Sequence, residues 1–462
     1  MLLYKCHKLV GGKNMGKLFG TDGVRGIANE ELSPELAYKI GRAGAFVLSK
    51  GKKGPIVVGK DTRKSGDMLE SALISGIMSV GLDVISVGVV PTPAVAYLTR
   101  KYNALSGVVI SASHNPVEYN GIKFFNEDGY KLNDDIEEEI EEYILNPETI
   151  KNRPTGASIG KRIEIRDGGL AYIEYLKDTV NVDFTGLKIA MDCGNGAVYD
   201  VAPKLLKELN SEVVVINNEP NGVNINVDCG STNPEMVQKL VLETNADVGL
   251  SFDGDADRLI AVDEKGNIVD GDHILAICGT NFKEKGKLKN DTVVGTVMTN
   301  MGLDMYLKGK NINVVKTKVG DRYVIEEMLS SDYILGGEQS GHIIFLEHNT
   351  TGDGLLTAIQ LISVMVGTGK KMSELNEIMT NFPQVLVNAK VKNEFKNRFM
   401  EDETIKQEIE KIEELFHGEG RVVIRPSGTE PLVRVMIEAK DDKDLLKVAT
   451  ELADLIEERL GN

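Results

Sequence analysis

Short apolar, strand-like runs alternate with amphipathic stretches over the first third of the chain. The runs lie at residues 56–58, 84–87 and 108–110. A stretch with helical spacing, Asp67 to Val80, separates the first two. This alternation predicts an α/β unit with a parallel or mixed sheet. Because ligands of such sheets bind beyond the carboxyl ends of the strands, functional side chains are expected where these strands end.

The same pattern returns further along the chain. A helix over 170–179 and a strand over 188–191 open a second unit, which closes with the apolar run 248–252. A hairpin-like stretch, 259–269, is expected to open a third unit that repeats strand and helix through residue 329. Three α/β units in series suggest repeated domains, although no strict sequence period is present.

The C-terminal part has a different character. A charged stretch, 392–414, precedes residues 421–438 and a C-terminal helix, and together they predict a smaller α+β domain. Four domains also suit a chain of 462 residues, at roughly 100–200 residues per domain. The predicted domains are residues 1–160, 161–258, 259–375 and 376–462.

An acidic run at residues 134–142 predicts a further helix, because isoleucines recur at helical spacing and Asn133 or Asp134 can cap its start. Its carboxylates are interpreted as a solvated helix face. A metal site is the less favoured alternative.

The composition, with 42% hydrophobic and 27% charged residues, is that of a soluble globular protein. A net charge of −17 disfavours a nucleic-acid partner, so any bound phosphate requires a local positive pocket. No apolar run approaches the roughly 20 residues that cross a bilayer, and the chain does not open with a signal peptide. A cytoplasmic protein without a membrane partner is therefore expected. Residues 1–14, before Met15, are predicted to be dispensable.

The cysteines are scattered and form no Cys-x-x-Cys pair, so neither a zinc site nor a disulfide framework is indicated. They are interpreted as small core or loop residues. The four are Cys6, Cys193, Cys229 and Cys278.

Candidate chemistry first occurs after the apolar strand at 107–110, in the run 111–116. A strand-end serine beside a histidine can be a nucleophile, which makes Ser113 and His114 candidates. Lys123, a few residues on, can neutralise a transferring phosphoryl group. A proline-capped turn rich in Ser and Asn is the alternative.

Three aspartates alternate in the turn after the apolar run 248–252. Asp253, Asp255 and Asp257 can point at one centre, which suits a hard divalent cation with oxygen ligands. An EF-hand is disfavoured, because a strand follows and no Glu stands at the twelfth loop position. Arg258 stands where a cation can hold a phosphate bound to the metal. A solvated acidic turn is the alternative.

The glycine-flexible loop at residues 336–342 presents Glu338, Ser340 and His342. These side chains offer the directional hydrogen bonds that a polyhydroxylated ligand needs. Taken alone, the loop is better explained as a simple glycine-rich turn.

The loop at residues 425–431 combines an arginine, hydroxyl groups and glycine-freed backbone amides, which make a cradle for a phosphate dianion. An exposed turn is an equal alternative for this loop alone. The residues of the cradle are Arg425, Ser427, Gly428 and Thr429.

Two further loops, 20–26 and 59–63, carry basic residues. Arg25 and Lys60 can reach the serine loop. Ordinary ion pairs between domains are equally favoured for Lys60 and Arg63. Only Arg25 is therefore added to the candidate site.

Taken together, in this order and over almost the whole chain, the loops resemble the catalytic serine, metal, sugar and phosphate loops of the α-D-phosphohexomutase superfamily. The resemblance implies four domains around a central cleft, three of them sharing an α/β topology. Within the superfamily, the run 19–26, the Glu-Gln-Ser-Gly-His sugar loop, the run 319–324 and the phosphate loop are most similar to phosphoglucosamine mutases. Phosphomannomutase/phosphoglucomutases more often have Met where Gln339 stands.

The resemblance also implies a role for each loop. The serine is phosphorylated, one Mg²⁺ per chain is held with Arg258 beside it, and the remaining loops bind the sugar hydroxyls and the phosphate that is not reacting. His114, Lys123 and His342 are candidate proton carriers, among which the resemblance does not decide. The implied residues are Ser113 as the phosphoserine; Ser113, Asp253, Asp255 and Asp257 for the metal; Glu338 and Ser340 for the hydroxyls; and Arg425, Ser427, Gly428 and Thr429 for the phosphate.

The implied activity is an isomerase reaction that interconverts glucosamine 6-phosphate and glucosamine 1-phosphate through a 1,6-bisphosphate and supplies UDP-N-acetylglucosamine synthesis. A hexose 1,6-bisphosphate is the implied activator, and the chain is a monomer or a homodimer. The nearest alternative is a sibling phosphomannomutase/phosphoglucomutase. A metal-dependent phosphatase is disfavoured by the sugar and phosphate loops, and a non-catalytic binding protein by the intact serine and aspartates.

Overall fold

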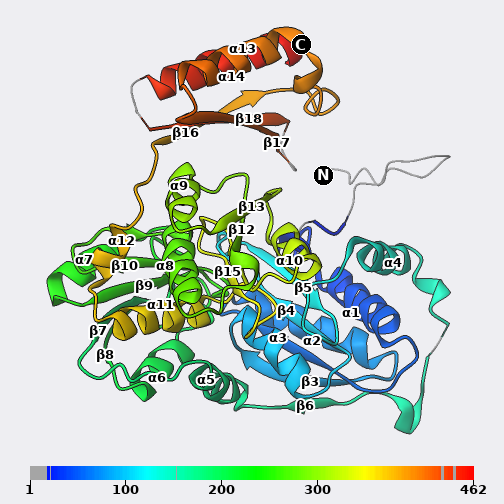
Figure 1. Ribbon diagram of the computed structural model, residues 1–462. Coiled ribbons are helices and arrows are strands. Elements are labelled where there is room, and N and C mark those ends of the chain that lie inside the picture. The colour runs from blue at the N-terminus through cyan, green and yellow to red at the C-terminus, as the bar shows by residue number, and fades with distance from the viewer. Residues whose placement is uncertain (1–17, 21, 152, 428–430, 441–443, 462) are drawn as a thin grey trace.

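The computed structural model shows four domains, of which three pack into one body and the fourth stands apart on a single connecting segment (Figure 1). This confirms the predicted four-domain α/β architecture. The exact domain limits stay predictions. The structure describes residues 18–20, 22–151, 153–427, 431–440 and 444–461.

The first domain contains a six-stranded sheet in the order β1-β5-β4-β2-β3-β6. The four strands from β4 to β6 in this order are parallel, and β5 and β1 extend one edge antiparallel. The apolar runs at 56–58, 84–87 and 108–110 lie in β2, β3 and β4, as predicted. The elements are β1 (Val24–Ile27), α1 (Pro34–Ser49), β2 (Pro55–Lys60), α2 (Ser65–Met78), β3 (Asp83–Val89), α3 (Thr92–Lys101), β4 (Ser106–Ile110), β5 (Tyr119–Phe125), α4 (Asp134–Leu145) and β6 (Arg162–Glu164).

The second sheet has the order β11-β10-β9-β7-β8. The predicted hairpin at 259–269 forms, but the expectation that it opens the third unit was wrong, because β10 pairs antiparallel with β9. The short turn 253–258 returns the chain beside the strand that precedes it. The elements are α5 (Gly168–Asp178), β7 (Lys188–Asp192), α6 (Val201–Glu208), β8 (Glu212–Ile216), α7 (Glu235–Thr244), β9 (Val248–Phe252), β10 (Leu259–Asp263) and β11 (Ile268–Val269).

The third sheet is four-stranded, in the order β13-β12-β14-β15. One hydrophobic cluster runs through all three domains of the body and includes Phe125, Tyr172 and Leu335, all fully buried. The elements are α8 (Gly271–Glu284), β12 (Thr292–Thr296), α9 (Met301–Gly309), β13 (Asn313–Thr317), α10 (Asp321–Ser330), β14 (Leu335–Gly337), β15 (Ile343–Phe345), α11 (Gly354–Thr368) and α12 (Met372–Asn376).

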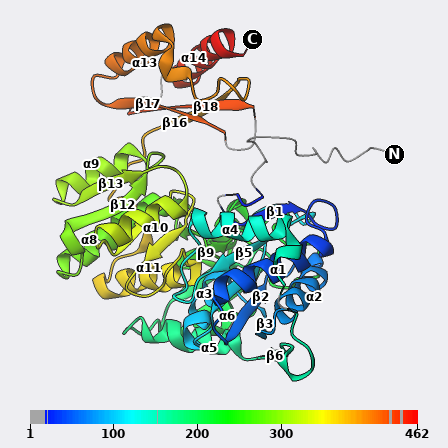
Figure 2. The same ribbon diagram turned by 90° about the vertical axis from the view of Figure 1, so that its right-hand side faces the viewer.

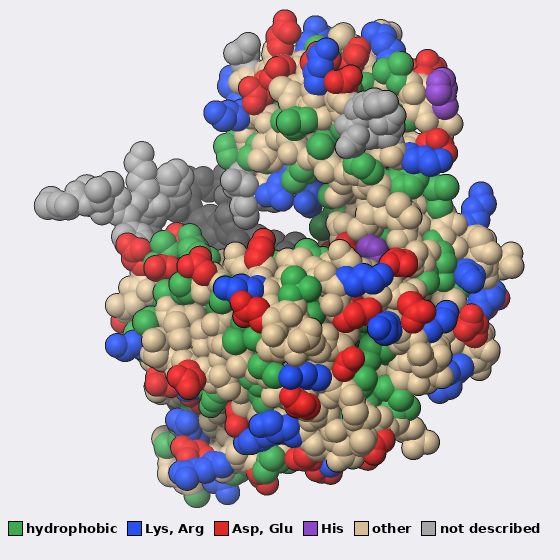
Figure 3. Space-filling model, turned by 90° about the vertical axis from the view of Figure 1, so that its left-hand side faces the viewer, with side chains coloured by type: hydrophobic (Ala, Val, Ile, Leu, Met, Phe, Trp, Pro, Cys, Tyr) green, Lys and Arg blue, Asp and Glu red, His purple; other side chains and the backbone are tan. Residues whose placement is uncertain are grey.

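The fourth domain is a three-stranded antiparallel sheet with two helices on the face turned away from the body (Figures 1 and 2). Its core is a separate cluster of residues from this domain alone, among them Val435 and Leu452. A hollow separates it from the body, and Lys and Arg side chains gather on the upper side of that hollow (Figure 3). The elements are β16 (Gln384–Lys390), α13 (Glu403–Leu415), β17 (Gly420–Pro426), β18 (Leu432–Ala439) and α14 (Leu445–Leu460).

The acidic run forms helix α4, with Asn133 as its cap accepting a hydrogen bond from Ile136 N at 3.1 Å. Ile140 and Ile144 are buried, which confirms the predicted amphipathic helix. Arg322 of α10 forms an ion pair with Asp134 at 2.5 Å, so part of the acidic face contacts another domain.

Cys193, Cys229 and Cys278 are buried free thiols, as predicted. Cys6 and residues 1–14 lie outside the described residues. Within the described part of the chain, no helix has the length and apolar character needed to cross a membrane.

Candidate active site

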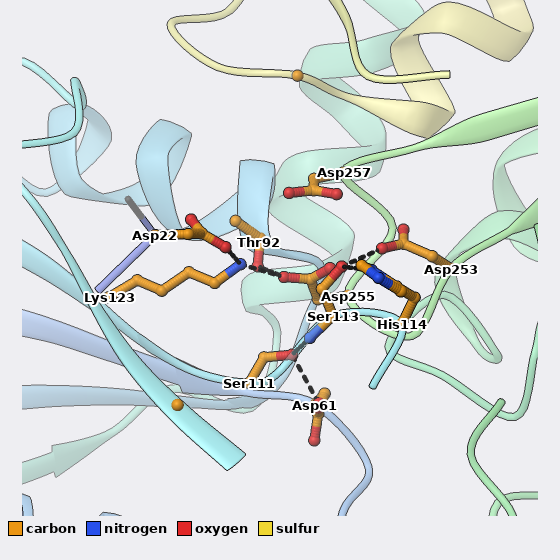
Figure 4. Close-up of polar contacts among 12 residues, drawn as sticks. Asp22, Asp61, Thr92, Ser111, Ser113, His114, Lys123, Asp253, Asp255 and Asp257 are labelled. Carbon is orange, nitrogen blue, oxygen red and sulfur yellow. Dashed lines mark hydrogen bonds and ion pairs between the residues drawn. The ribbon is translucent and has the colours of Figure 1, made fainter. Parts of the chain in front are cut away.

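Ser113 lies in the turn that follows β4, with its backbone held in an uncommon conformation (Figure 4). Its φ is +53°, in the left-handed region, which costs a non-glycine residue roughly 1 kcal/mol. Ser113 N donates to Ser111 Oγ at 3.0 Å, and Ser111 Oγ donates to Asp61 at 2.6 Å. These bonds anchor the turn to the neighbouring strand β2.

Arg63 binds the backbone carbonyl groups of the same turn. Its guanidinium donates to the carbonyl oxygens of Ser113 at 3.0 Å, Asn115 at 2.7 Å and Pro116 at 2.6 Å. It also forms an ion pair with Asp61 at 2.9 Å. The sequence left Arg63 undecided, and the structure gives it both the ion pair and a supporting role in the site. The parallel pairing of β2 and β4 was the available signal, because both strands end at one edge.

Lys60, the other undecided residue, does not contact the serine loop through any described bond. Its Nζ donates to Glu70 at 2.5 Å and also to Asp67. Lys60 therefore forms ion pairs, but they lie within the first domain and not between domains.

The three aspartates of the turn after β9 are buried together beside the serine. Asp253, Asp255 and Asp257 each offer a carboxylate oxygen, and these atoms lie within 4.8 Å of one another. Ser113 Oγ donates to Asp253 Oδ2 at 2.5 Å (Figure 4). A Cβ on Gly254 would lie 2.5 Å from the Ser113 carbonyl oxygen, so glycine is required for this approach of the two loops.

The donor set fits a divalent cation. Asp255 Oδ1 and Asp257 Oδ1 are buried and make no hydrogen bond to any described residue. Burial and the charges of Asp257 and Asp255 raise the pKa of Asp253 well above its usual value. Three crowded carboxylates with open oxygens are what a hard cation would neutralise.

Lys123 Nζ bridges the metal loop and the first domain, donating to Asp255 at 2.9 Å and forming an ion pair with Asp22 at 2.9 Å. Burial disfavours its charge, but Asp22 and Asp255 raise its pKa above the usual value. Lys123 is therefore an ammonium at neutral pH. Arg25 donates to the same Asp22 carboxylate. Asp22 was not among the residues that the sequence singled out. The signal for Asp22 was its place in the glycine-rich loop beside Arg25.

The two histidines differ in charge. His114 Nδ1 lies 3.3 Å from Ser113 Oγ, and burial, followed by the charges of Arg258 and Arg25, lowers its pKa to about 4. The ring is therefore neutral at pH 7 and can accept a proton. His342 Nδ1 lies 3.6 Å from Asp257. Burial alone would lower the pKa of His342, but Asp257 and Asp321 raise it overall.

Arg258 and the sugar loop border the aspartates. The backbone N–H of Arg258 donates to Asp253 at 3.2 Å, and its Nε lies 3.8 Å from Asp257. Glu338 is half-buried and accepts from Gly320 N at 3.1 Å, while Ser340 is exposed. Both sugar-loop side chains are thus accessible to a ligand.

The phosphate loop lies on the fourth domain. Arg425, at the end of β17, stands opposite Arg434 on β18. Burial and the charge of Arg434 lower the pKa of Arg425, and Glu338 opposes this shift. Two adjacent guanidinium groups favour a bound anion. Ser427 is buried, and its carbonyl accepts from Lys396 Nζ at 2.7 Å, a cation that the sequence did not single out. Gly428 and Thr429 lie outside the described residues.

Known proteins are similar to this chain in sequence and in fold. The Alkaliphilus metalliredigens phosphoglucosamine mutase is 65% identical over 448 residues, 97% of this chain and 100% of that protein. A phosphoglucomutase/phosphomannomutase family protein from Burkholderia thailandensis shares the fold, with a TM-score of 0.80 and 24% identity over 95% of this chain and 97% of that one. Aspergillus fumigatus N-acetylphosphoglucosamine mutase, solved with GlcNAc-6P and magnesium, has a TM-score of 0.68 and 18% identity over 95% of each chain. Phosphoglucomutase/phosphomannomutase family models match residues 16–151 (alpha/beta/alpha domain I), 170–266 (alpha/beta/alpha domain II), 270–382 (alpha/beta/alpha domain III) and 386–455 (C-terminal domain).

Proposed function

The chain belongs to the phosphoglucosamine mutase family of isomerases, and on this premise we propose how its own residues interconvert glucosamine 6-phosphate and glucosamine 1-phosphate. The observation that carries the proposal is the position of Ser113. Its Oγ lies 2.5 Å from Asp253, within a buried group of three aspartates and Lys123. Positioning and electrostatics supply most of the catalysis in phosphoryl transfer, and this site provides both.

In the proposed cycle, phosphorylated Ser113 gives its phosphoryl group to the free hydroxyl of a sugar monophosphate. The bond from Ser113 Oγ to phosphorus breaks as the bond from the sugar oxygen forms, which yields a 1,6-bisphosphate. The bisphosphate then turns end for end. Its original phosphate passes to Ser113, and the isomeric monophosphate leaves.

We assign the proton carriers by charge. The attacking sugar hydroxyl must lose its proton, and we assign its acceptance to neutral His114, 3.3 Å from Ser113 Oγ, because the nearer Asp253 is assigned to the cation. Lys123 stays an ammonium and stabilises the phosphoryl group that is being transferred. His342, protonated more readily than an ordinary histidine, is the candidate donor on the side of Asp257.

One Mg²⁺ would be held by Asp253, Asp255 and Asp257 together with a phosphoryl oxygen on Ser113. A phosphoserine carries up to two negative charges, which the three carboxylates would repel. When bound, the ion supplies the compensating positive charge. A hexose 1,6-bisphosphate would act as activator by returning a phosphoryl group to Ser113.

Recognition of the substrate is assigned to the two outer loops. Glu338 and Ser340 would bind sugar hydroxyls. The fourth domain would hold the phosphate that is not reacting, and the same cradle must accept either phosphate after reorientation. The cytoplasmic location and the monomer or homodimer stay predictions. The proposed cradle is Arg425, Ser427, Gly428 and Thr429.

The test is the rate of glucosamine 6-phosphate conversion by wild type and Ser113→Ala, with Mg²⁺ and a trace of a hexose 1,6-bisphosphate. Loss of activity in Ser113→Ala, with clear activity in Ser71→Ala, at an exposed serine of α2, as the matched control, supports the mechanism. Full activity of Ser113→Ala would sink the phosphoserine assignment. Faster conversion of glucose or mannose phosphate would show that the chain prefers the substrates of a phosphomannomutase/phosphoglucomutase. Release of inorganic phosphate would indicate a phosphatase.

A further inference from the structure

Lys131 is a largely buried cation that links the first and third domains. Its Nζ donates to Asp22 Oδ1 at 2.6 Å and also to Asp321. Asp22 precedes β1 of the first domain, and Asp321 is the first residue of α10 in the third. The Lys131 side chain is only 14% exposed, so it is placed for these two carboxylates and not for solvent.

The backbone places Lys131 beside β5, the strand that carries Lys123. After β5 the chain turns tightly, and Asn126 Oδ1 accepts from the N–H groups of Asp128 at 3.0 Å and Tyr130 at 2.9 Å. Lys131 then pairs with Phe125 in an antiparallel bridge. Because directly paired residues and alternate residues of a strand share a face, Lys131 lies on the same face as Lys123.

Two charged arms lead from Lys131 to the metal loop. In one arm, Asp22 contacts Lys123, and Lys123 contacts Asp255, with both distances at 2.9 Å. In the other arm, Asp321 lies 3.5 Å from His342 Nε2, and His342 Nδ1 lies 3.6 Å from Asp257. Charges alternate along the first arm, and in the second arm His342 Nε2 also accepts a hydrogen bond from Gly352 N at 3.1 Å.

We propose that Lys131 is a positioning residue for the transfer reaction, which fixes Lys123 and His342 relative to each other across the domain boundary through Asp22 and Asp321. It does not touch the reacting atoms. Removing its charge would leave the partly buried carboxylates of Asp22 and Asp321, 22% and 16% exposed, facing each other, and their repulsion would displace both arms. The inference rests on the proposed function, since it assumes that Lys123 and His342 act on the substrate.

The domain boundary has a second set of contacts that does not involve Lys131. Arg322 of α10 donates to the Leu132 carbonyl and to Asp134, the latter at 2.5 Å. These contacts hold the two domains together when Lys131 is altered. A loss of activity on substitution of Lys131 can therefore be separated from a loss of folding.

The experiment measures kcat, KM and unfolding temperature for Lys131→Gln, Asp321→Asn and the double variant. Lys131→Gln is expected to lower kcat about 10- to 100-fold, as misplacement of catalytic groups by about 1 Å does, with a smaller change in KM. The double variant is expected to be faster than Lys131→Gln alone, because one of the facing carboxylates is then neutral. Lys52→Gln, which removes an exposed lysine paired with Glu127, is the control and should match wild type.

A wild-type kcat in Lys131→Gln would overturn the inference. A double variant whose decrease in kcat equals the product of the decreases in the two single variants would also overturn it. If Lys131→Gln is too unstable to assay, the comparison of the double variant with Asp321→Asn decides: similar rates support the inference, and a further large loss contradicts it. Failure of the proposed function is distinguishable, because wild type itself would then not convert glucosamine 6-phosphate.

Discussion

The three-domain body and the C-terminal domain are built in different ways. The body has one hydrophobic cluster running through all three of its domains, and its charged site residues, such as Lys123 and Asp255, are buried and paired with one another. The C-terminal domain has its own core and presents half-buried Arg425 at the edge of its sheet. The difference indicates that the groups proposed to react are held by packed surroundings, while the arginine proposed to bind the distal phosphate belongs to a domain with its own core.

The junction between the two regions depends on a few polar contacts. Glu438 accepts from Met301 N at 2.8 Å and from Arg421 at 2.7 Å. Arg421 also donates to the Thr299 carbonyl at 2.5 Å. A domain held this way can move as a unit. In a closed cleft the bisphosphate would turn away from water, and in an open cleft the substrate would enter and the product would leave. Four experiments test the contrast, from the largest expected effect to the smallest.

Asp255→Asn should have the largest effect, because Asp255 lies among the buried, paired charges of the three-domain body. Asp255 accepts from Lys123 at 2.9 Å and from Thr92 at 2.7 Å, and it offers an open oxygen to a cation. We expect kcat to fall about 100- to 1,000-fold and Mg²⁺ affinity to weaken. Steady-state kinetics and a calorimetric Mg²⁺ titration measure both. The exposed Asp332→Asn is the control, and unchanged Mg²⁺ binding in Asp255→Asn would contradict the metal assignment.

Arg425→Lys should act on binding and leave the chemistry largely intact. A lysine keeps the charge but loses the planar fork that meets a phosphate with two hydrogen bonds. We expect KM for glucosamine 6-phosphate to rise about tenfold, with a smaller change in kcat. Arg398→Lys, which alters a more exposed arginine of the same domain, should match wild type. A fall in kcat at constant KM would mean that Arg425 contributes to the phosphoryl transfer itself and not to substrate binding.

Glu438→Gln should loosen the junction without unfolding either region. The variant keeps the shape of the side chain but removes its charge pair with Arg421. Small-angle scattering should then show a larger radius of gyration for the free enzyme, and KM should rise severalfold. Glu419→Gln, at an exposed pair with Lys440, is the control. An unchanged scattering curve would show that the orientation of the domain does not depend on this pair.

The smallest effect is expected on folding stability, where His114→Gln should change the pH dependence of the free energy of unfolding, apart from any loss of the proton transfer assigned to His114. The pKa of His114 is lowered from 6.5 to about 4, so between these values the unfolded chain binds a proton that the folded chain does not. The free energy of unfolding of wild type should therefore decline as pH falls from 6.5 to 4, by an amount that His114→Gln lacks. Denaturant titrations at pH 7, 5.5 and 4.5 measure the difference. Identical pH profiles would contradict the lowered pKa.

The sequence predicted those parts of the site that lie at strand ends. Ser113 and Asp253 follow the fully buried strands β4 and β9, so the apolar runs were enough to locate both loops from the order of residues alone. The hairpin at 259–269 was placed in the wrong unit, because strand periodicity does not state which sheet a strand joins. Local pattern thus located both loops, and the roles of their residues in the reaction stay proposals.

Partners supplied by distant segments could not be predicted in the same way. Lys131 meets Asp321 across 190 positions of sequence, and Arg63 reaches the Ser113 carbonyl from a different strand end. Such contacts depend on how domains and strands pack, and a single sequence carries no periodic signal for them. A charged residue in a loop looks the same whether water or a buried carboxylate will surround it.

The separate core of the C-terminal domain has a consequence for how the molecule can change over evolutionary time. A unit that carries its own core and meets its neighbour through a few polar bonds can be exchanged or grafted at residues 377–383 with little damage to the rest. In the body, by contrast, one hydrophobic cluster of described residues runs through all three domains. Asp22, Lys131 and Asp321 form one ionic group shared by two domains, so a change at one of them is expected to alter the setting of the other two.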